Sequence, residues 1–215
     1  MQIYLEAFTN GPVATNSFLI WDDEKNAVLV DAPPGSFDEV REAVEREGLA
    51  LAALVLTHTH WDHTADANRF REHFGEDFLI YVHPDDEYRL ADPMKYLVWD
   101  IPLEMEPTTP DRHLHHGDVF ELGAMRFDIL LAPGHTEGSI CLYAPDHGFI
   151  VSGDILLAGA IGRYDLPGGD LETLQKSLRE VLMPLPDDTQ VFPGHGPPTT
   201  IGEERRSNPY VDYVA

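Results

Sequence analysis

Residues 51–63 read LAALVLTHTHWDH, an apolar run that leads directly into three histidines and an aspartate. The near-continuous apolar character of Leu51–Thr57 predicts a buried strand. His58 and His60 stand two positions apart, so in extended backbone both side chains point to the same side and can bind one cation. The first candidate metal ligands are therefore expected at the end of a strand.

Two more candidate ligands, Asp62 and His63, follow where we expect the chain to turn into a helix. The change in backbone direction can aim them at a second cation. Imidazole suits zinc, iron or manganese, and a neighbouring carboxylate favours a borderline to hard divalent ion. A lone buried histidine is more often a core residue, but this cluster directly after an apolar strand predicts half of a dinuclear metal site.

Three later segments repeat one pattern, in which a histidine or aspartate follows an apolar strand and stands beside glycine. They are Pro133-Gly134-His135, Ser152-Gly153-Asp154 and Pro193-Gly194-His195-Gly196. Glycine lets the backbone turn tightly and approach a buried ion closely. Each segment alone is more often an ordinary turn, but together with the first cluster they predict further metal ligands.

Short apolar runs alternate with helical patterns through most of the chain, which predicts an α/β architecture. A first helix is expected over residues 37–47, with a capping box that begins at Ser36 and an end at Gly48. Another is expected to be capped by Asp170 and stopped by Pro184. The remaining expected elements are strands at residues 3–8, 17–21, 27–30, 51–57, 78–82, 118–122, 125–131, 139–143, 149–152 and 190–192, a helix at 67–74 and a helix-containing insertion or loop at 84–112.

The composition favours one acidic globular domain over residues 1–215. Acidic residues number 38 against 14 basic ones, and the net charge of -24 would repel nucleic acid and anionic membranes. This balance fits either an ordinary acidic bacterial protein or one from a salt-adapted source. We see no basic leader and no apolar stretch long enough to span a bilayer, so we expect a cytoplasmic protein. Cys141 is the only cysteine, which excludes an internal disulfide and a cysteine-rich zinc module, and its apolar strand predicts a buried small hydrophobe.

Taken in order, these histidines and aspartates resemble the ligand pattern of the metallo-β-lactamase superfamily across most of the chain. The resemblance implies an α/β fold of four layers, an αβ/βα sandwich, with two divalent ions, zinc in the first place and iron or manganese as alternatives. The implied ligands are His58, His60 and His135 for the first ion, Asp62, His63 and His195 for the second, and Asp154 as the bridging carboxylate. Zinc-dependent class B1 and B2 lactamases carry cysteine at the position of Asp154, which disfavours β-lactam hydrolysis here.

Within the superfamily, the sequence most resembles the glyoxalase II group, and especially its short bacterial members. The stretches that carry this resemblance are LAPGHTEGS (residues 131–139), GRYDLPGGD (162–170) and PGHGP (193–197), with Asn208-Pro209 near the end. The resemblance implies hydrolysis of a small thioester of the hydroxyacylglutathione type. Full-length members carry a C-terminal helical domain that supplies much of the glutathione-binding surface, whereas only about twenty residues follow His195 here.

The expected reaction is attack of a metal-bridging hydroxide on the thioester carbonyl. Asp62 is expected to orient the hydroxide or accept its proton, and Asp154 to hold the two ions at a fixed separation. Arg163, one of few cations, and Tyr164 are the candidates for substrate contacts. An ion pair of Arg163 with Asp165 or Asp154, which would fix the loop, is the alternative role.

A rival interpretation is a persulfide dioxygenase, an oxidoreductase whose fold and Gly-Arg-x-Asp loop look similar. It uses one iron held by two histidines and an aspartate, which would be His58, His135 and Asp154. A lactonase, another esterase and an RNA-processing nuclease are less favoured, the nuclease because of the acidic charge. The expected partner is therefore a small thioester, with neither nucleic acid nor membrane, and the oligomeric state is not predicted.

Overall fold

The structure is a computed structural model that describes residues 2–211. The described chain divides into two compact units. The first takes in the chain up to Leu114 together with Glu121–Arg126, and the second takes in His115–Phe120 and the chain from Phe127 onward. The expected single domain over residues 1–215 stays a prediction.

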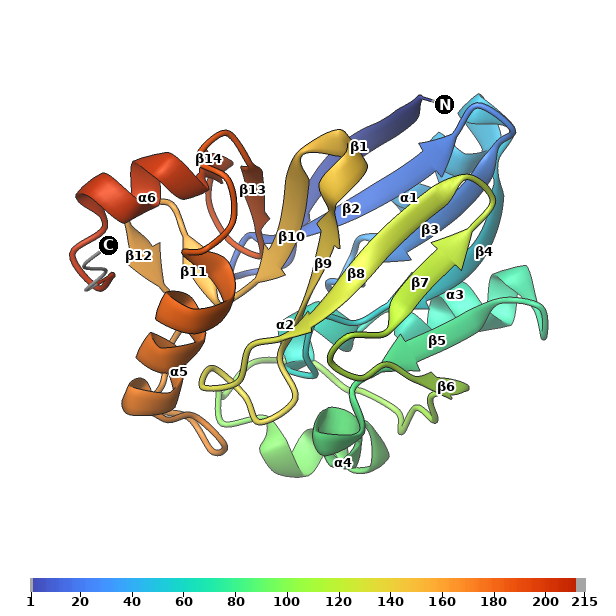
Figure 1. The fold of residues 1–215 in the computed structure, drawn as a ribbon. Helices are drawn as coiled ribbons and strands as arrows, with labels where there is room; N and C mark the ends of the chain where they lie inside the picture. The colour runs from blue at the N-terminus through green and yellow to red at the C-terminus, as the bar shows by residue number, and fades with distance from the viewer. Residues whose placement is uncertain (1, 212–215) are drawn as a thin grey trace. The chain divides into compact units, whose positions relative to one another are not determined.

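Within the described residues, the first unit is built on a six-stranded sheet of order β1-β2-β3-β4-β5-β6 (Figure 1). Its strands are β1 (Ile3–Asn10), β2 (Thr15–Asp22), β3 (Asn26–Val30), β4 (Ala50–Val55), β5 (Leu79–Val82) and β6 (Arg112–His113). β1 to β3 pair antiparallel, and β3 to β6 pair parallel. Parallel neighbours need crossovers, two of which contain α1 (Phe37–Glu47) and α3 (Ala67–Phe74). The other helical segments are α2 (Trp61–Thr64), η1 (Pro84–Asp86), α4 (Glu87–Ala91) and η2 (Pro93–Tyr96).

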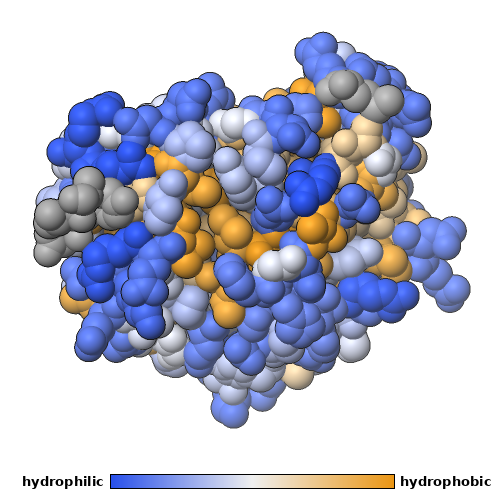
Figure 2. All heavy atoms as spheres, in the orientation of Figure 1, coloured by the Kyte–Doolittle hydropathy of each residue, from blue (hydrophilic) through white to orange (hydrophobic). Residues whose placement is uncertain are grey.

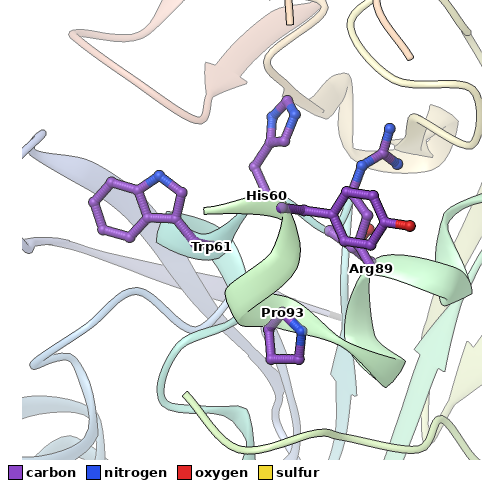
Figure 3. Close-up of a pocket in the computed structure, with 6 residues that line it drawn as sticks. His60, Trp61, Arg89 and Pro93 are labelled. Atoms are coloured by element: carbon purple, nitrogen blue, oxygen red, sulfur yellow. The ribbon is translucent and has the colours of Figure 1, made fainter. Parts of the chain in front are cut away.

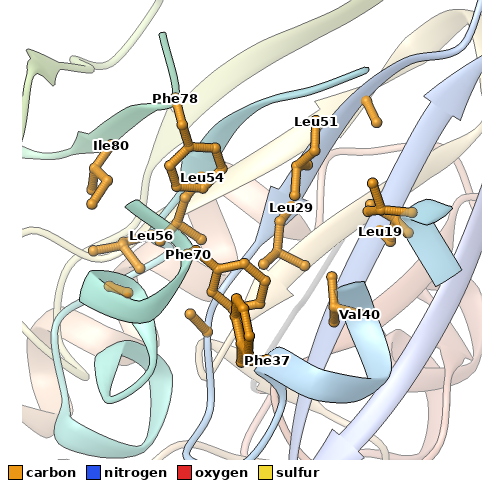
Figure 4. Packing of buried hydrophobic residues seen from close by; sticks show 14 of the residues in the cluster. Leu19, Leu29, Phe37, Val40, Leu51, Leu54, Leu56, Phe70, Phe78 and Ile80 are labelled. Carbon is orange, nitrogen blue, oxygen red and sulfur yellow. The ribbon is translucent and has the colours of Figure 1, made fainter. Parts of the chain in front are cut away.

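The core of the first unit lies between this sheet and helices α1 and α3. Leu29 and Leu54 from neighbouring strands pack in one buried cluster with Phe37 and Phe70 from the two helices (Figure 4). The two phenylalanine rings meet edge to face, with centroids 5.2 Å apart. Burial of each such side chain contributes about 1.5–3 kcal/mol, so the packing holds β3 and β4 firmly. The loops that follow these two strands carry the predicted ligand cluster and its supports.

Helix α1 begins in a way that the sequence analysis did not foresee. The predicted capping box is wrong, because the Ser36 hydroxyl donates to the Pro33 carbonyl at 2.7 Å and does not cap the helix. Instead the Asp66 carboxylate accepts the backbone N–H groups of Gly35 and Phe37, each at 3.0 Å. The cap is thus a side chain distant in the sequence, which no local pattern reveals.

Within the described residues, the second unit carries a six-stranded sheet of order β14-β13-β10-β9-β8-β7 and a two-stranded sheet of β11 and β12. The strands are β7 (Val119–Leu122), β8 (Met125–Leu131), β9 (Ile140–Ala144), β10 (Phe149–Gly153), β11 (Leu156–Leu157), β12 (Ala160–Ile161), β13 (Gln190–Pro193) and β14 (Thr199–Thr200). β8 and β10 both run antiparallel to β9, and β10 pairs parallel with β13. The carboxyl ends of β8, β10 and β13 therefore lie along one edge of the sheet.

One buried cluster joins this sheet to its helices. The helical segments are η3 (Pro145–His147), α5 (Leu171–Ser177), the π-helical turn Leu178–Leu182 and α6 (Ile201–Ser207). Leu174 of α5 packs with Ile150 of β10 and with Cys141 of β9. Cys141 is fully buried in this cluster, which confirms its prediction as a small hydrophobe, and its burial raises the pKa of the thiol to about 12. The predicted cap of α5 is confirmed too, since Asp170 accepts the Thr173 N–H at 2.7 Å.

The fold class predicted from the sequence is confirmed as mixed α/β, with two main sheets and helices in the part of the chain that the structure describes. Strands β6, β11, β12 and β14 and helix α6 were not predicted, because they are too short to show a periodic pattern. Hydrophilic residues spread over much of the face shown in Figure 2. Over residues 2–211, every helix is too short or too polar to cross a lipid bilayer.

Candidate metal centre

The cluster predicted at residues 58–63 lies just beyond β4 and in helix α2. His60 is the residue before α2, and Asp62 and His63 lie within that helix. The His58 ring centroid is 4.9 Å from that of His60 and 4.0 Å from that of His63. His63 Nε2 lies 3.5 Å from Asp62 Oδ2. The structure thus gathers the four candidate ligands of the first unit, with His58 and His63 almost fully buried.

Asp31, at the end of β3, orients two of these histidines. His63 Nδ1 lies 2.7 Å from Asp31 Oδ2, and because a carboxylate accepts, the Nδ1 proton is donated and Nε2 keeps its lone pair. The Thr57 hydroxyl donates to the same oxygen at 2.7 Å and therefore accepts from His58 Nδ1 at 3.1 Å. Both imidazoles present Nε2 as the lone-pair atom that a metal ion requires.

Asp31 was not among the residues predicted for the site. Its backbone has a φ of 61°, in the left-handed region that aspartate tolerates better than most side chains. The Thr57 N–H donates to Asp31 Oδ1 at 2.8 Å, which fixes the carboxylate from a second side. The signal that could have revealed Asp31 is the one used for Asp154, an acidic residue directly after an apolar strand. Thr15, whose hydroxyl donates to Asp62 Oδ2 at 2.7 Å, left no such signal.

In the second unit, two predicted histidines converge on one oxygen of Asp154. His135 Nε2 lies 3.6 Å and His195 Nε2 lies 3.4 Å from Asp154 Oδ2. The three residues follow β8, β10 and β13, whose carboxyl ends share an edge of the sheet. A hydrogen bond of 2.8 Å from the Gly194 N–H to the Gly153 carbonyl ties two of these strand ends together. The order of the strands therefore explains why ligands so far apart in sequence meet.

A main-chain carbonyl orients His135. Its Nδ1 donates to the Arg163 carbonyl at 2.7 Å, because a carbonyl only accepts, so Nε2 again keeps its lone pair. Gly162 makes this close approach possible: a Cβ there would overlap the main-chain oxygen of Asp154 and come within 2.9 Å of His135 Nδ1. The glycine that precedes Arg163 in the GRYD loop is thus required by the packing of two candidate ligands.

The predicted substrate residues line a pocket in the same unit. It has a volume of about 350 Å³ and is bordered by Gly162, Arg163, Tyr164, Asp165 and Tyr210, together with Ile161. The Arg163 guanidinium donates to both Asp165 oxygens, at 2.9 and 2.8 Å, so the predicted ion pair within the loop is present. This hydrogen bonding raises the pKa of Arg163 and lowers that of Asp165. Tyr210 was not predicted, because it lies beyond the last recognisable motif.

The donor set of each unit fits a borderline divalent ion. Five imidazoles and two carboxylates are the candidate ligands, and neutral nitrogen with carboxylate oxygen suits zinc, iron or manganese. Three of the imidazoles have their outer nitrogen engaged by Asp31, Thr57 or the Arg163 carbonyl. Such second contacts are typical of histidines that bind metals, because they set the tautomer and the direction of the ring.

Comparison with known proteins identifies the family. Residues 10–195 match the metallo-beta-lactamase superfamily, and the chain belongs to it. A curated relative, the hydroxyacylglutathione hydrolase GloC of Haemophilus influenzae, is 38% identical over 207 residues, which cover 92% of each chain. Members of this superfamily are mostly hydrolytic enzymes, and the candidate ligands indicate that this chain binds divalent metal ions.

Solved structures agree with this assignment. The BLEG-1 B3 metallo-beta-lactamase is 32% identical with a TM-score of 0.89, over 97% of this chain and 100% of that one. TTHA1623 in a di-iron-bound form is 35% identical with a TM-score of 0.85, over 96% and 100% of the two chains. ETHE1 from Myxococcus xanthus is 28% identical with a TM-score of 0.80, over 96% of this chain and 83% of that one.

Proposed function

We propose that this chain is a dinuclear metal-dependent hydrolase of thioesters, of the hydroxyacylglutathione hydrolase type. The observation that carries the proposal is the position of Asp154, where two imidazole nitrogens converge on one carboxylate oxygen in the manner of a bridging ligand. The likeness to GloC over 92% of the chain supports the reaction class. The chain's negative charge supports a small-molecule substrate over nucleic acid or an anionic membrane.

The family pattern assigns the candidate ligands to two ions. His58, His60 and His135 would hold one ion, Asp62, His63 and His195 would hold the other, and Asp154 would be shared by both. When bound, two divalent ions lower the pKa of a water molecule toward neutrality and polarise the carbonyl of an ester or thioester.

The protein's own residues direct this chemistry. The Asp62 carboxylate, fixed by the Thr15 hydroxyl at 2.7 Å, orients the attacking water and accepts its proton. The Asp154 carboxylate would hold the two ions together. A thiolate is a stable leaving group, since a thiol has a pKa of about 8.5, so the reaction requires no strong general acid.

Arg163 and Tyr164 are the proposed substrate contacts, with Tyr210 as a further wall of their pocket. Arg163 is already paired with Asp165, which holds the guanidinium in a defined position for an anionic group of the thiol carrier. Because its carbonyl also orients His135, the pocket adjoins the proposed centre. Tyr164 and Tyr210 are 40% and 44% exposed, so both rings are accessible to a substrate.

The rival function, an iron-dependent persulfide dioxygenase, uses only His58, His135 and Asp154. The likeness to TTHA1623 in a di-iron-bound form means that the presence of iron does not separate the two functions. The number of ions per chain does, because the rival needs one and the hydrolase needs two. The likeness to a B3 metallo-beta-lactamase makes a β-lactam a necessary member of any substrate panel.

The test is a kinetic panel on the metal-loaded protein with S-lactoylglutathione, other thioesters, a lactone, a β-lactam and glutathione persulfide. We expect hydrolysis of the thioesters with the highest kcat/KM. In the Arg163→Ala variant, KM for a thioester with an anionic carrier should rise about tenfold, with kcat nearly unchanged. For an uncharged thioester, KM and kcat of the same variant should equal those of the unmodified protein. Thioester inactivity with both metals in place, or oxygen uptake with the persulfide, contradicts the proposal.

A further inference from the structure

A buried ion pair lies behind the first two candidate ligands. Asp86 is fully buried and Arg89 is 2% exposed, and Arg89 Nη1 donates to Asp86 Oδ1 at 3.0 Å. The other carboxylate oxygen, Oδ2, accepts the Thr59 backbone N–H at 3.0 Å. The Thr59 hydroxyl donates to the Asp86 main-chain carbonyl at 2.7 Å. Thr59 is therefore anchored through both its backbone and its side chain.

Thr59 stands between His58 and His60. In extended backbone, alternate side chains point to opposite sides, so an anchor on Thr59 fixes the two histidines on the other side. The Asp86 carboxylate is itself held in place, because one oxygen is bound by Arg89 while the other binds Thr59. Rotation of this carboxylate would break both contacts.

Arg89 also lines a small pocket beside the candidate ligands. Thr59, His60 and Trp61 border this pocket, and so do Pro93 and Tyr96 of η2. Figure 3 shows Arg89 and His60 at this pocket, with Trp61 beside them and Pro93 across it. The guanidinium carbon of Arg89 lies 4.5 Å from the centre of the Tyr88 ring, which holds the side chain in place. The segment that contains α4 and η2 therefore borders Thr59, His60 and Trp61 at this pocket.

We propose that Asp86, held by Arg89, is a positioning residue for the metal ligands His58 and His60. A buried ion pair adds little net stability, because the desolvation of both charges offsets their attraction. Its contribution here is to set the direction of the stretch that contains two ligands of one ion. The inference rests on the proposed function only in assigning these two histidines to an ion, not in the choice of substrate.

The experiment compares Asp86→Ala with Asp22→Ala. Asp22 is a matched control: it is also a fully buried carboxylate of the first unit, and it accepts backbone N–H groups from Glu24, Asn26 and Ala124 at 2.8 to 3.0 Å. Asp22 is the last residue of β2 and precedes the start of β3, whereas Asp31 follows the end of β3. The readout is the affinity for each of two Zn²⁺ ions, measured by competition with a chelator. Asp86→Ala should lower the affinity for one Zn²⁺ ion by about 10–100-fold and leave the affinity for the other unchanged. Asp22→Ala should change neither affinity.

A second pair of variants keeps the test decisive if Asp86→Ala fails to fold. Thr59→Val removes the hydroxyl that donates to Asp86 at almost constant volume, and Thr59→Ser retains it. We expect Thr59→Val to lower the affinity for the same Zn²⁺ ion by about tenfold, and Thr59→Ser to bind this ion as the unmodified protein does. Unchanged affinities in Asp86→Ala and Thr59→Val, or an equal loss in Asp22→Ala, overturn the inference. An unmodified protein that binds no Zn²⁺ overturns both this inference and the proposed function, whereas one that binds Zn²⁺ but hydrolyses no thioester contradicts only the proposed function.

Discussion

The two groups of candidate ligands are supported in different ways. In the first unit, the ligands come from one short stretch, and side chains such as Asp31 and Thr57 orient them. In the second unit, His135, Asp154 and His195 come from three separate strand ends, and His135 is oriented by a main-chain carbonyl. Side-chain support can be removed by one substitution, whereas main-chain support depends on the path of the backbone and on the glycines that permit it.

The largest effect is expected from the residue on which the second group converges. Asp154→Ala removes the oxygen that lies within 3.6 Å of His135 Nε2 and 3.4 Å of His195 Nε2. We expect loss of both metal ions and a fall in kcat/KM of about a thousandfold, or about 4 kcal/mol. Metal analysis alongside kinetics checks this. A variant that keeps two ions and loses only rate would show that Asp154 does not bridge.

The second effect concerns the main-chain support itself. Gly162→Ala places a Cβ against the main-chain oxygen of Asp154 and the Nδ1 of His135. Overpacking of this kind typically destabilises by about 1–3 kcal/mol, and here it should displace two ligands as well. Thermal unfolding and Zn²⁺ affinity should therefore fall together. Gly159→Ala is the control: its added Cβ meets nothing within 4 Å, but the φ of 69° strains any side chain there, so this variant should lower the thermal stability and leave the Zn²⁺ affinity unchanged.

The corresponding change in the first unit is Asp31→Asn. Asparagine tolerates the φ of 61°, so the variant tests the charge and the acceptor oxygen with little added strain. We expect metal affinity to fall about 10–100-fold, the usual loss when a second contact of a metal-binding histidine is removed. Arg163→Ala should not lower it, because that variant keeps the carbonyl that orients His135. Equal losses in the two variants would contradict the distinction between the units.

The smallest effect separates the helix caps of the two units by their pH dependence. Hydrogen bonds from the Thr173 side chain and backbone lower the pKa of Asp170, so its stabilisation is present above the unfolded value of about 3.9 and is lost as pH falls further. Burial raises the pKa of Asp66, so its ionised form opposes folding increasingly as pH rises through the folded value. The stability difference between the unmodified protein and Asp170→Ala should shrink from pH 7 to pH 3. For Asp66→Asn we expect the opposite trend: the stability of this variant relative to the unmodified protein should be higher at pH 7 than at pH 3. The same trend in both variants would contradict the opposite pKa shifts of Asp66 and Asp170.

The sequence indicated the histidine–aspartate cluster of residues 58–63 as candidate ligands because the cluster is local. An apolar strand followed by closely spaced histidines leaves a signal within a few residues, and the strand-end pattern of His135, Asp154 and His195 repeats it. The helices over residues 37–47 and after Asp170 were likewise indicated by the spacing of apolar residues and by the residues at their ends.

The supporting contacts were not predicted because they join residues far apart in the chain. Asp31 contacts Thr57 across 26 positions and His63 across 32, and Thr59 meets Asp86 across 27. The capping of α1 failed for the same reason, since Asp66 replaces the local Ser36. Local patterns indicate candidate ligands, and only the folded chain shows which side chains hold them in place.

The most direct test of the central claim is the number of metal ions per chain. The purified protein, loaded separately with Zn²⁺, Fe²⁺ or Mn²⁺ and freed of excess metal, should retain about two ions per chain, as a dinuclear site requires. Asp31→Asn should release them at a lower chelator concentration than the unmodified protein. A single ion per chain under every loading condition would contradict the dinuclear centre, and a single iron with persulfide-dependent oxygen uptake would establish the rival function.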